Sequence, residues 1–162
     1  TGGFTDCLLQ YGARSVACVD TAYGQLAYKL RTDERITIFE RSNALHLEPP
    51  NPNALDLVVM DLGWTVQRLA IPAAIRWLKP GAHIISLIKP HYEAKELDRE
   101  NEIIEGVLPE EAADEISRIT FDNMHTLSVE PIGLTKSPIL GGGKRGKKKG
   151  NLEHLAFLRL PA

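Results

Sequence analysis

Short apolar runs alternate with amphipathic stretches along this chain, and that order constrains its fold more than any other feature. The apolar runs have the length of strands and cover residues 15–20, 36–40, 55–61 and 83–89. The run over 55–61 is apolar almost throughout, as in strands that are covered on both faces. Two late strands are expected over 126–133 and 153–160. The alternation predicts an α/β fold, an open and doubly wound sheet with helices on both faces.

Four helices are expected between these strands, over residues 5–11, 24–31, 65–78 and 109–124. Gly12 follows the first helix as a C-terminal glycine, and Pro109 suits the first turn of the last one. The segment Lys79-Pro-Gly81 is expected to close the third helix, and residues 48–53 form a proline-rich loop. The sequence has no internal repeat, so we expect one domain over residues 1–162.

The composition is that of an ordinary globular domain. The 162 residues are 43% hydrophobic and 25% charged, with a formal net charge of −2 and a sequence pI near 6.2. Such a chain can meet a nucleic acid only through a local basic patch. No apolar run approaches the roughly 20 residues of a membrane span, so we expect no membrane partner and a cytoplasmic location. Cys7 and Cys18 lack metal-ligand spacing, so we expect small core residues in a reducing cytosol, and no metal.

A polar residue ends each of the four early strands, and these residues are Asp20, Glu40, Asp61 and Lys89. Open α/β sheets bind ligands outside the carboxyl ends of their strands, where the strand order reverses. All four side chains would therefore project at the same rim of the sheet. This convergence predicts a ligand site at that rim.

Three places near the rim are candidates for holding a ligand. The opening Thr1-Gly2-Gly3-Phe4 puts paired glycines before a helix, where backbone can approach a ligand, although Gly-Gly turns are common. Asp20 could accept hydrogen bonds from ribose hydroxyls, or it could cap a helix or lie solvated in a loop. Asn43 could offer its amide to an adenine edge, or it could be an ordinary turn residue.

Asp61 and Lys89 end strands that we expect to be neighbours in the sheet. A lysine at the end of an apolar strand is costly unless it is paired or used, and the alternative is a surface lysine whose stem lies along the sheet. Partial burial lowers the pKa of a lysine and favours its neutral base form, whereas a nearby aspartate orients it. Glu153 would start the last strand near the same rim.

A basic segment lies immediately before Glu153. Between Gly141 and Gly150 the chain holds five cations, Lys144, Arg145, Lys147, Lys148 and Lys149. The functional interpretation is phosphate contact with a nucleic acid, and the alternative is a solvated loop. The position next to Glu153 favours the phosphate contact.

In these residues the chain resembles the TlyA/FtsJ group of RNA 2′-O-methyltransferases. The opening Thr1-Gly-Gly-Phe-Thr-Asp-Cys-Leu-Leu looks like the end of that family's cofactor-binding motif. Residues 19–26, 40–44 and 88–93 are similar to further motifs of TlyA-type members, the last of them to a Lys-Pro-Gln-Phe-Glu segment. Residues 133–139 and 150–155 resemble the carboxyl-terminal motifs. The matches follow one another in order over nearly the whole chain, and together they are specific.

The resemblance implies a fold, a cofactor and an active site. The fold is a Rossmann-like methyltransferase sheet, mostly parallel with an antiparallel last strand. The cofactor is S-adenosylmethionine, which motif position assigns to Gly2, Gly3, Phe4, Asp20, Asn43 and Asp61. The family methylates a ribose 2′-hydroxyl with a Lys-Asp-Lys-Glu tetrad, and its last three members correspond to Asp61, Lys89 and Glu153.

The same resemblance implies that parts of the family pattern lie upstream of Thr1. These parts are the first lysine of the tetrad, the first strand, the start of the glycine loop and the S4-like RNA-binding domain of TlyA-type members. We therefore expect the chain to lack its natural amino-terminal part and to be an incomplete enzyme by itself, since loss of a central strand leaves buried edges unpaired.

Two features depart from the family pattern. Asp61-Leu-Gly-Trp64 stands where TlyA-type members have Asp-Val-Ser-Phe, and the loop before Glu153 is longer and more basic. The first departure bears on the substrate pocket and the second on the RNA contact surface.

The sequence thus predicts S-adenosylmethionine-dependent 2′-O-methylation of a ribose in RNA, with ribosomal RNA as the expected partner. The subfamily has also carried a haemolysin label, but nothing in this sequence resembles a pore former. Two alternatives stay open: a non-catalytic RNA-binding protein with a degenerate methyltransferase fold, and a methyltransferase for a small molecule or a protein. A measurement of cofactor binding distinguishes the first alternative from an RNA methyltransferase. A salt-dependent affinity for RNA distinguishes the second. The sequence does not indicate an oligomeric state.

Overall fold

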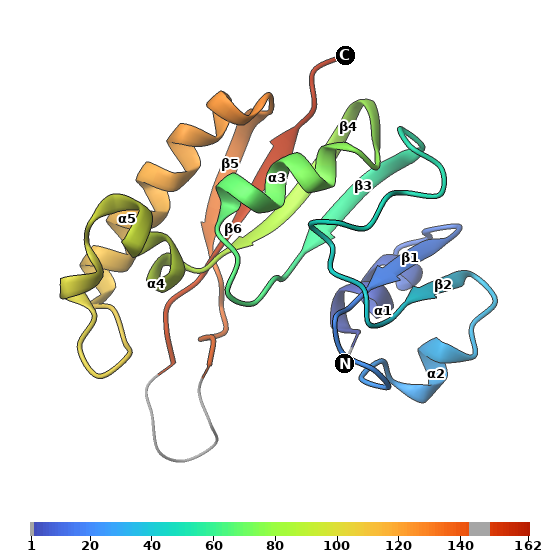
Figure 1. Cartoon of the computed structure of the whole chain (residues 1–162), viewed down its shortest axis with the longest axis horizontal. Coiled ribbons are helices and arrows are strands. Elements are labelled where there is room, and N and C mark those ends of the chain that lie inside the picture. Colours follow the sequence, from blue (N-terminus) through green and yellow to red (C-terminus); the bar gives the residue numbers. More distant parts are fainter. Residues whose placement is uncertain (1, 143–149) are drawn as a thin grey trace. The chain divides into compact units, whose positions relative to one another are not determined.

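The computed structural model describes residues 2–142 and 150–162, and the chain divides into two compact units, residues 1–48 and 49–162 (Figure 1). Each unit contains its own sheet, of two strands in the first and four in the second. Among the described residues, no helix is long and apolar enough to cross a lipid bilayer.

The first unit combines a pair of parallel strands with two helices. Its elements are α1 Gly3–Gln10, β1 Val16–Val19, α2 Tyr28–Arg31 and β2 Ile36–Phe39. The backbone before α1 requires glycine at Gly2, because its φ is 91° and a Cβ there would lie 2.5 Å from Leu26 Cδ1 and from Leu30 Cδ1. Gly2 therefore lets the backbone enter α1 close to Leu26 and Leu30.

Two predictions about the first unit need correction. The helix predicted over 24–31 forms only in its last turn, since Gly24 has a φ of 72° and the residues up to Ala27 are not helical. Cys7 is exposed and Cys18 is half-buried, so the prediction that both are core residues is wrong. The Sγ atom of the half-buried Cys18 lies 3.1 Å from the Thr5 hydroxyl.

The second unit holds the larger sheet, its helices and three short 3-10 helices. In chain order the strands and α-helices are β3 Leu55–Met60, α3 Gln67–Ile75, β4 Leu78–Ile88, α4 Pro90–Glu93, α5 Glu110–Asn123, β5 Glu130–Lys136 and β6 His154–Arg159. The 3-10 helices are η1 Ala94–Leu97, η2 Glu100–Glu102 and η3 Met124–Leu127.

The strand order in this sheet is β3-β4-β6-β5. β3 and β4 are parallel, and β6 is antiparallel to both of its neighbours, β4 and β5. Three strands therefore run in one direction and only the last one of the chain runs against them, as predicted. The larger sheet is therefore mixed, since β6 forms antiparallel ladders with β4 and β5, and among the described residues no ladder joins β1 or β2 to β3.

One face of the larger sheet is packed against α3 and α5. Alternate residues of β4, among them Ile84 and Ile88, are fully buried, and they join Ile71 of α3 and Leu158 of β6 in one core. α5 packs on this same face, since its Asp114 contacts His154, which has the same parity in β6 as Leu158. The described helices α3 and α5 thus lie on one face of this sheet.

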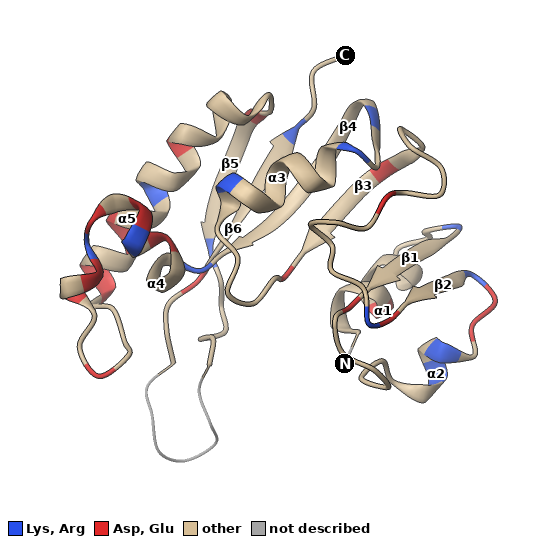
Figure 2. Ribbon diagram, viewed as in Figure 1, with Lys and Arg blue, Asp and Glu red and all other residues tan. Residues whose placement is uncertain are grey.

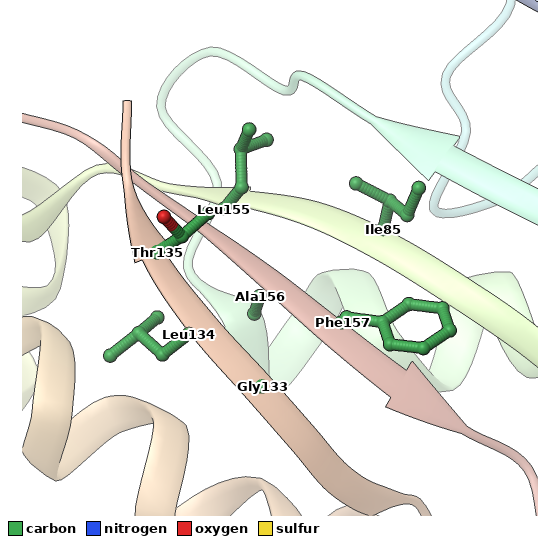
Figure 3. Close-up of a pocket in the computed structure, with 7 residues that line it drawn as sticks. All are labelled: Ile85, Gly133, Leu134, Thr135, Leu155, Ala156 and Phe157. Carbon is green, nitrogen blue, oxygen red and sulfur yellow. The ribbon is translucent and has the colours of Figure 1, made fainter. Parts of the chain in front are cut away.

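The opposite face of the sheet carries a shallow apolar depression of about 360 Å³ (Figure 3). It is lined by Ile85 of β4, by Leu155, Ala156 and Phe157 of β6, and by Gly133, Leu134 and Thr135 of β5. His83 stacks on Phe157 at this face, with 5.0 Å between the ring centroids. Among the described residues, neither Asp61, Lys89 nor Glu153 lines the depression.

Two element boundaries differ from the predicted ones for identifiable reasons. β4 starts at Leu78, five residues before the predicted strand, because Leu78 is fully buried and pairs with Leu55 across a register shift. The segment Lys79-Pro-Gly81 thus belongs to the strand rather than to a helix end. β5 starts at Glu130, because the residues predicted to begin that strand form η3.

Candidate active site

Asp61 and Lys89 meet at the carboxyl ends of two neighbouring parallel strands. Asp61 follows β3 and Lys89 follows β4, and the ladder places Met60 opposite Ser86. The Nζ atom of Lys89 lies 2.6 Å from Oδ1 of Asp61. The Lys89 side chain is only 15% exposed, whereas that of Asp61 is 50% exposed. A lysine so covered needs its anionic partner, and the partner keeps one side open to a ligand.

The backbone beyond Lys89 is fixed by a tight turn. Pro90 ends the strand, because it cannot donate to a ladder, and begins α4. The carbonyl of Lys89 accepts a hydrogen bond of 2.8 Å from Tyr92 N and one of 3.4 Å from Glu93 N. The position of the lysine Cα is therefore set by both the sheet and the turn.

Glu153 is placed beside Lys89 by the antiparallel ladder between β4 and β6. Ile88 pairs with His154, so the residue after Ile88 and the residue before His154 are neighbours across the two strands. Glu153 is 8% exposed. Burial raises the pKa of its carboxyl, and of the two nearby charges Lys89 lowers that pKa while Asp61 raises it. Asp61, Lys89 and Glu153 thus form one electrostatically coupled group, which we call the charged triad.

The backbone next to Glu153 is fixed by hydrogen bonds of Gly141 and Asn151, which the sequence did not indicate. Gly141 and Asn151 exchange two backbone hydrogen bonds, of 2.9 and 2.8 Å. A Cβ on Gly141 would lie 1.9 Å from Oε1 of Glu153, so any other residue there would displace the Glu153 carboxylate. The side chain of Asn151 accepts from Leu108 N at 3.0 Å and donates to the Gly106 carbonyl at 3.0 Å. The glycines that flank the basic segment were the available signal, but in the sequence they indicated a loop rather than a close approach of Gly141 to Glu153.

An aromatic pair lies next to the charged triad. Trp64, 89% exposed, stacks on Tyr92 with 5.1 Å between the ring centroids. The Nζ atom of Lys89 lies 6.0 Å from the centroid of the Tyr92 ring. Trp64 appeared in the sequence only as a departure from the family pattern, and Tyr92 only as part of a matching motif. The structure makes them an exposed aromatic surface beside the lysine.

The predicted cofactor residues of the first unit form local turns and a helix start. Gly3 begins α1, a Cβ there would meet nothing within 4 Å, and the neighbouring Phe4 is 39% exposed. Asp20 follows β1, and its Oδ1 accepts a hydrogen bond of 2.8 Å from Ala22 N. Asn43 uses its own Oδ1 in the same way, accepting from Leu45 N at 2.9 Å. The open approach to Gly3 and the exposed carboxylate of Asp20 are compatible with a nucleoside ligand.

Glu40, which ends β2, has a structural task within the first unit. Its carboxylate pairs with the Arg31 guanidinium and accepts a hydrogen bond of 2.8 Å from Gly24 N. The bond from Arg31 lowers the pKa of Glu40, more than the bond from Gly24 does. Glu40 thus ties α2 and the preceding loop to β2, and it is the one polar strand end that we do not assign to a ligand.

Several other described charges of the second unit lie in ion pairs. Acidic and basic residues are interspersed along α5 and the segments next to it (Figure 2). Lys136 of β5, for example, lies 2.9 Å from Glu110 and 3.0 Å from Asp114. The predicted RNA-contacting residues Lys144, Arg145, Lys147, Lys148 and Lys149 lie outside the described residues. In residues 2–142 and 150–162, no three His, Cys, Asp or Glu side chains gather as a metal site would require.

The triad and the sheet that carries it define an α/β protein with a charged site at its strand ends, and comparisons with known proteins give the family. The family model described as FtsJ-like methyltransferase matches residues 1–144, and the chain belongs to this family. It is 37% identical to "Putative rRNA methyltransferase YqxC" of Bacillus subtilis, over 99% of this chain and 55% of that protein.

Two further similarities agree with the family. The chain is 43% identical to the 16S/23S rRNA (cytidine-2′-O)-methyltransferase TlyA of Mycobacterium tuberculosis, over 57% of this chain and 35% of TlyA. A solved structure, a "Putative hemolysin from Streptococcus thermophilus", matches with a TM-score of 0.86 and 31% identity, over 99% of this chain and 56% of that one. The chain thus spans about half the length of these relatives, or less.

Proposed function

We propose that this chain is the catalytic part of an S-adenosylmethionine-dependent enzyme that methylates a ribose 2′-hydroxyl in ribosomal RNA. The observation that carries the proposal is the charged triad, in which Lys89 Nζ lies 2.6 Å from Asp61 Oδ1 and Glu153 is the cross-strand neighbour of the lysine. Membership of the FtsJ-like family and the rRNA activities named for two relatives support it.

In the proposed reaction the triad handles the proton of the ribose hydroxyl. When bound, S-adenosylmethionine supplies a methyl group that is already electrophilic. Lys89 acts as the base that receives the hydroxyl proton, and Asp61 holds the amino group toward the reacting oxygen. Glu153 orients Lys89 and the ribose. General-base catalysis of this kind contributes about 10²–10⁴ in rate, and positioning supplies much of the remainder.

The residues that would hold the cofactor come mainly from the first unit. The backbone of Gly2 and Gly3, with Phe4 beside them, is open to a ligand at the start of α1. Asp20 would accept hydrogen bonds from the ribose hydroxyls of the cofactor. Asn43 would face the adenine with its amide nitrogen, since its oxygen serves the turn to Leu45. By its motif position Asp61 is also proposed as a cofactor residue.

The aromatic pair supports RNA as the substrate. An exposed indole stacked on a second ring offers a flat face on which an unstacked nucleobase can lie, and base stacking of this kind contributes about 1–3 kcal/mol per base. Trp64 and Tyr92 lie next to Lys89, so a base on Trp64 would bring its ribose toward the triad. The basic segment from Lys144 to Lys149 is proposed to contact the phosphates.

Replacing Lys89 by alanine tests the proposal. The complete gene product carrying Lys89→Ala should bind S-adenosylmethionine with unchanged affinity in calorimetry and lose about 10²–10⁴ in methyl transfer to ribosomal RNA. Lys95→Ala is the matched control, because Lys95 is an exposed lysine of the same segment outside the triad. Full turnover by Lys89→Ala would remove Lys89 from the mechanism. Absence of cofactor binding by the wild type would instead favour a non-catalytic RNA-binding protein.

A further inference from the structure

Three buried polar residues lie behind the Asp61–Lys89 pair, and we call them the buried network. They are Ser86, Gln67 and Glu93, whose exposed fractions are 1%, 4% and 4%. The Ser86 hydroxyl donates to Oε1 of Gln67 at 2.6 Å, and Nε2 of Gln67 donates to the carbonyl of Leu87 at 3.2 Å. The first residue of α3 is thereby attached to β4, three residues or fewer before Lys89.

Glu93 completes the network from the other side of Lys89. Its Oε1 accepts a hydrogen bond of 2.9 Å from Gln67 N, the first orphan donor of α3. The helix has no side-chain cap of its own, because the side chain of Val66 at the N-cap cannot accept a hydrogen bond and the Thr65 hydroxyl is bonded to the carbonyl of Gly63. A carboxylate at this helix end is also favoured by the helix dipole. Glu93 therefore serves as the N-cap of a helix that lies 26 residues earlier in the chain.

The network joins the two segments that carry the reacting pair. The segment that begins at Asp61 leads to Gln67, and the turn that begins at Lys89 leads to Glu93. The hydrogen bond from Gln67 N to Glu93 therefore holds the far ends of both segments together. We propose that Glu93 is a positioning residue that holds Asp61 and Lys89 in register for the reaction. The inference rests on the proposed function, since the pair must be catalytic for its alignment to matter.

The burial of Glu93 disfavours its charged form. Burial raises the pKa of Glu93 to about 7, against the opposing effect of the bond from Gln67 N. Among charged groups, Glu96 of η1 raises this pKa and Arg68 of α3 lowers it, and α5 faces the segment with the apolar Ala113 and Ile116. Because the pKa of Glu93 is raised in the folded protein, its neutral form favours folding. Its contribution to the free energy of unfolding is therefore full below the pKa of the unfolded state and is lost as the pH rises through about 7.

The ionised carboxylate nevertheless makes the stronger bond to Gln67 N, because the bond is then charge-assisted. We therefore expect turnover of the wild type to fall as the pH drops below about 7, where Glu93 becomes neutral. Glu93→Gln keeps an acceptor oxygen and loses the charge. At pH 8 its turnover should lie on the order of 3- to 10-fold below the wild-type value, and this gap should close as the pH falls to 6.

The experiment compares Glu93→Gln, Glu93→Ala and the control Glu100→Gln, which removes an exposed carboxyl of η2. The readouts are kcat and KM for ribosomal RNA between pH 6 and 8, cofactor affinity, and amide hydrogen exchange of the peptides over 61–70 and 86–93. We expect Glu93→Ala to lower kcat at least about 10-fold, with cofactor affinity kept and exchange of both peptides raised. Glu93→Gln should rescue part of the rate.

Two results would overturn the inference. One is a Glu93→Gln enzyme with the wild-type kcat and the wild-type pH profile. The other is unchanged hydrogen exchange of both peptides in Glu93→Ala, or in Glu93→Gln at pH 8 if the alanine variant does not fold. The exchange readout needs no RNA, so it tests the positioning role of Glu93 even if the wild type methylates no RNA. That last result would overturn the proposed function alone.

Discussion

The candidate cofactor residues Asp20 and Asn43 of the first unit and the buried polar residues of the second unit are held in different ways. In the first unit, Asp20 and Asn43 accept hydrogen bonds from backbone only two residues further along. In the second unit, the bond from Gln67 N to Glu93 spans 26 residues and that from Leu108 N to Asn151 spans 43. The reacting groups are therefore aligned by the tertiary fold, whereas the candidate cofactor residues are presented by local turns.

This difference predicts different outcomes when a residue is removed. A turn residue can be deleted at little cost to folding, so its loss should appear in ligand affinity. A residue of the long-range networks contributes to the alignment of the site, so its loss should appear in turnover and in local stability.

Asp20→Ala is expected to have the larger of two effects that test this difference. It should weaken S-adenosylmethionine binding on the order of 10- to 100-fold, since hydrogen bonds to a charged group contribute about 1.5–3 kcal/mol. The midpoint of thermal unfolding should barely change, because the lost bond to Ala22 N is exposed. Calorimetry and a thermal melt measure the two quantities. Asp33→Ala, which removes another exposed turn acid of the same unit, is the control and should leave cofactor affinity unchanged.

If Asp20→Ala instead unfolds the protein, the turn is structural and the contrast between the units is wrong at this position. If both affinity and stability are unchanged, Asp20 takes no part in holding the cofactor.

Trp64→Ala is expected to have a smaller effect, and on the RNA rather than on the cofactor. Loss of the stacking surface should raise KM for RNA roughly 5- to 100-fold, with Trp64→Phe close to the wild type, because any aromatic face can stack on a base. Steady-state kinetics with ribosomal RNA measure it. Tyr28→Ala removes an equally solvent-exposed aromatic from the first unit and should change nothing. An unchanged KM in Trp64→Ala would show that no base rests on the indole.

The sequence predicted the charged triad because each member stands at a strand end. The apolar runs before Asp61 and Lys89 located two strands, and parallel strands that are neighbours end at the same rim. Glu153 followed from its place before the last strand, and the antiparallel direction of that strand makes it the neighbour of Lys89. The resemblance to the family had grouped the same three residues, and their catalytic roles stay predictions.

The rest of the site depends on tertiary contacts that no local pattern encodes. Glu93 appeared only as part of a motif, because its burial and its bond to Gln67 require α3 and α4 to pack side by side. The close approach of Gly141 to Glu153 depends on a bridge to Asn151 across the basic segment. The separation into two sheets was missed for a related reason, since local periodicity identifies strands but not which edges pair.

A double-mutant comparison tests most directly whether the charged triad acts as one catalytic unit. Single-turnover methyl transfer to ribosomal RNA should be measured for Lys89→Ala, Asp61→Asn and the double variant, with methylated riboses located by their resistance to alkaline cleavage. We predict losses of about 10²–10⁴ for Lys89→Ala and a double variant no slower than the slower single variant, because residues that act together are not additive. Losses that multiply, or single variants that transfer methyl groups at the wild-type rate, would contradict a shared role.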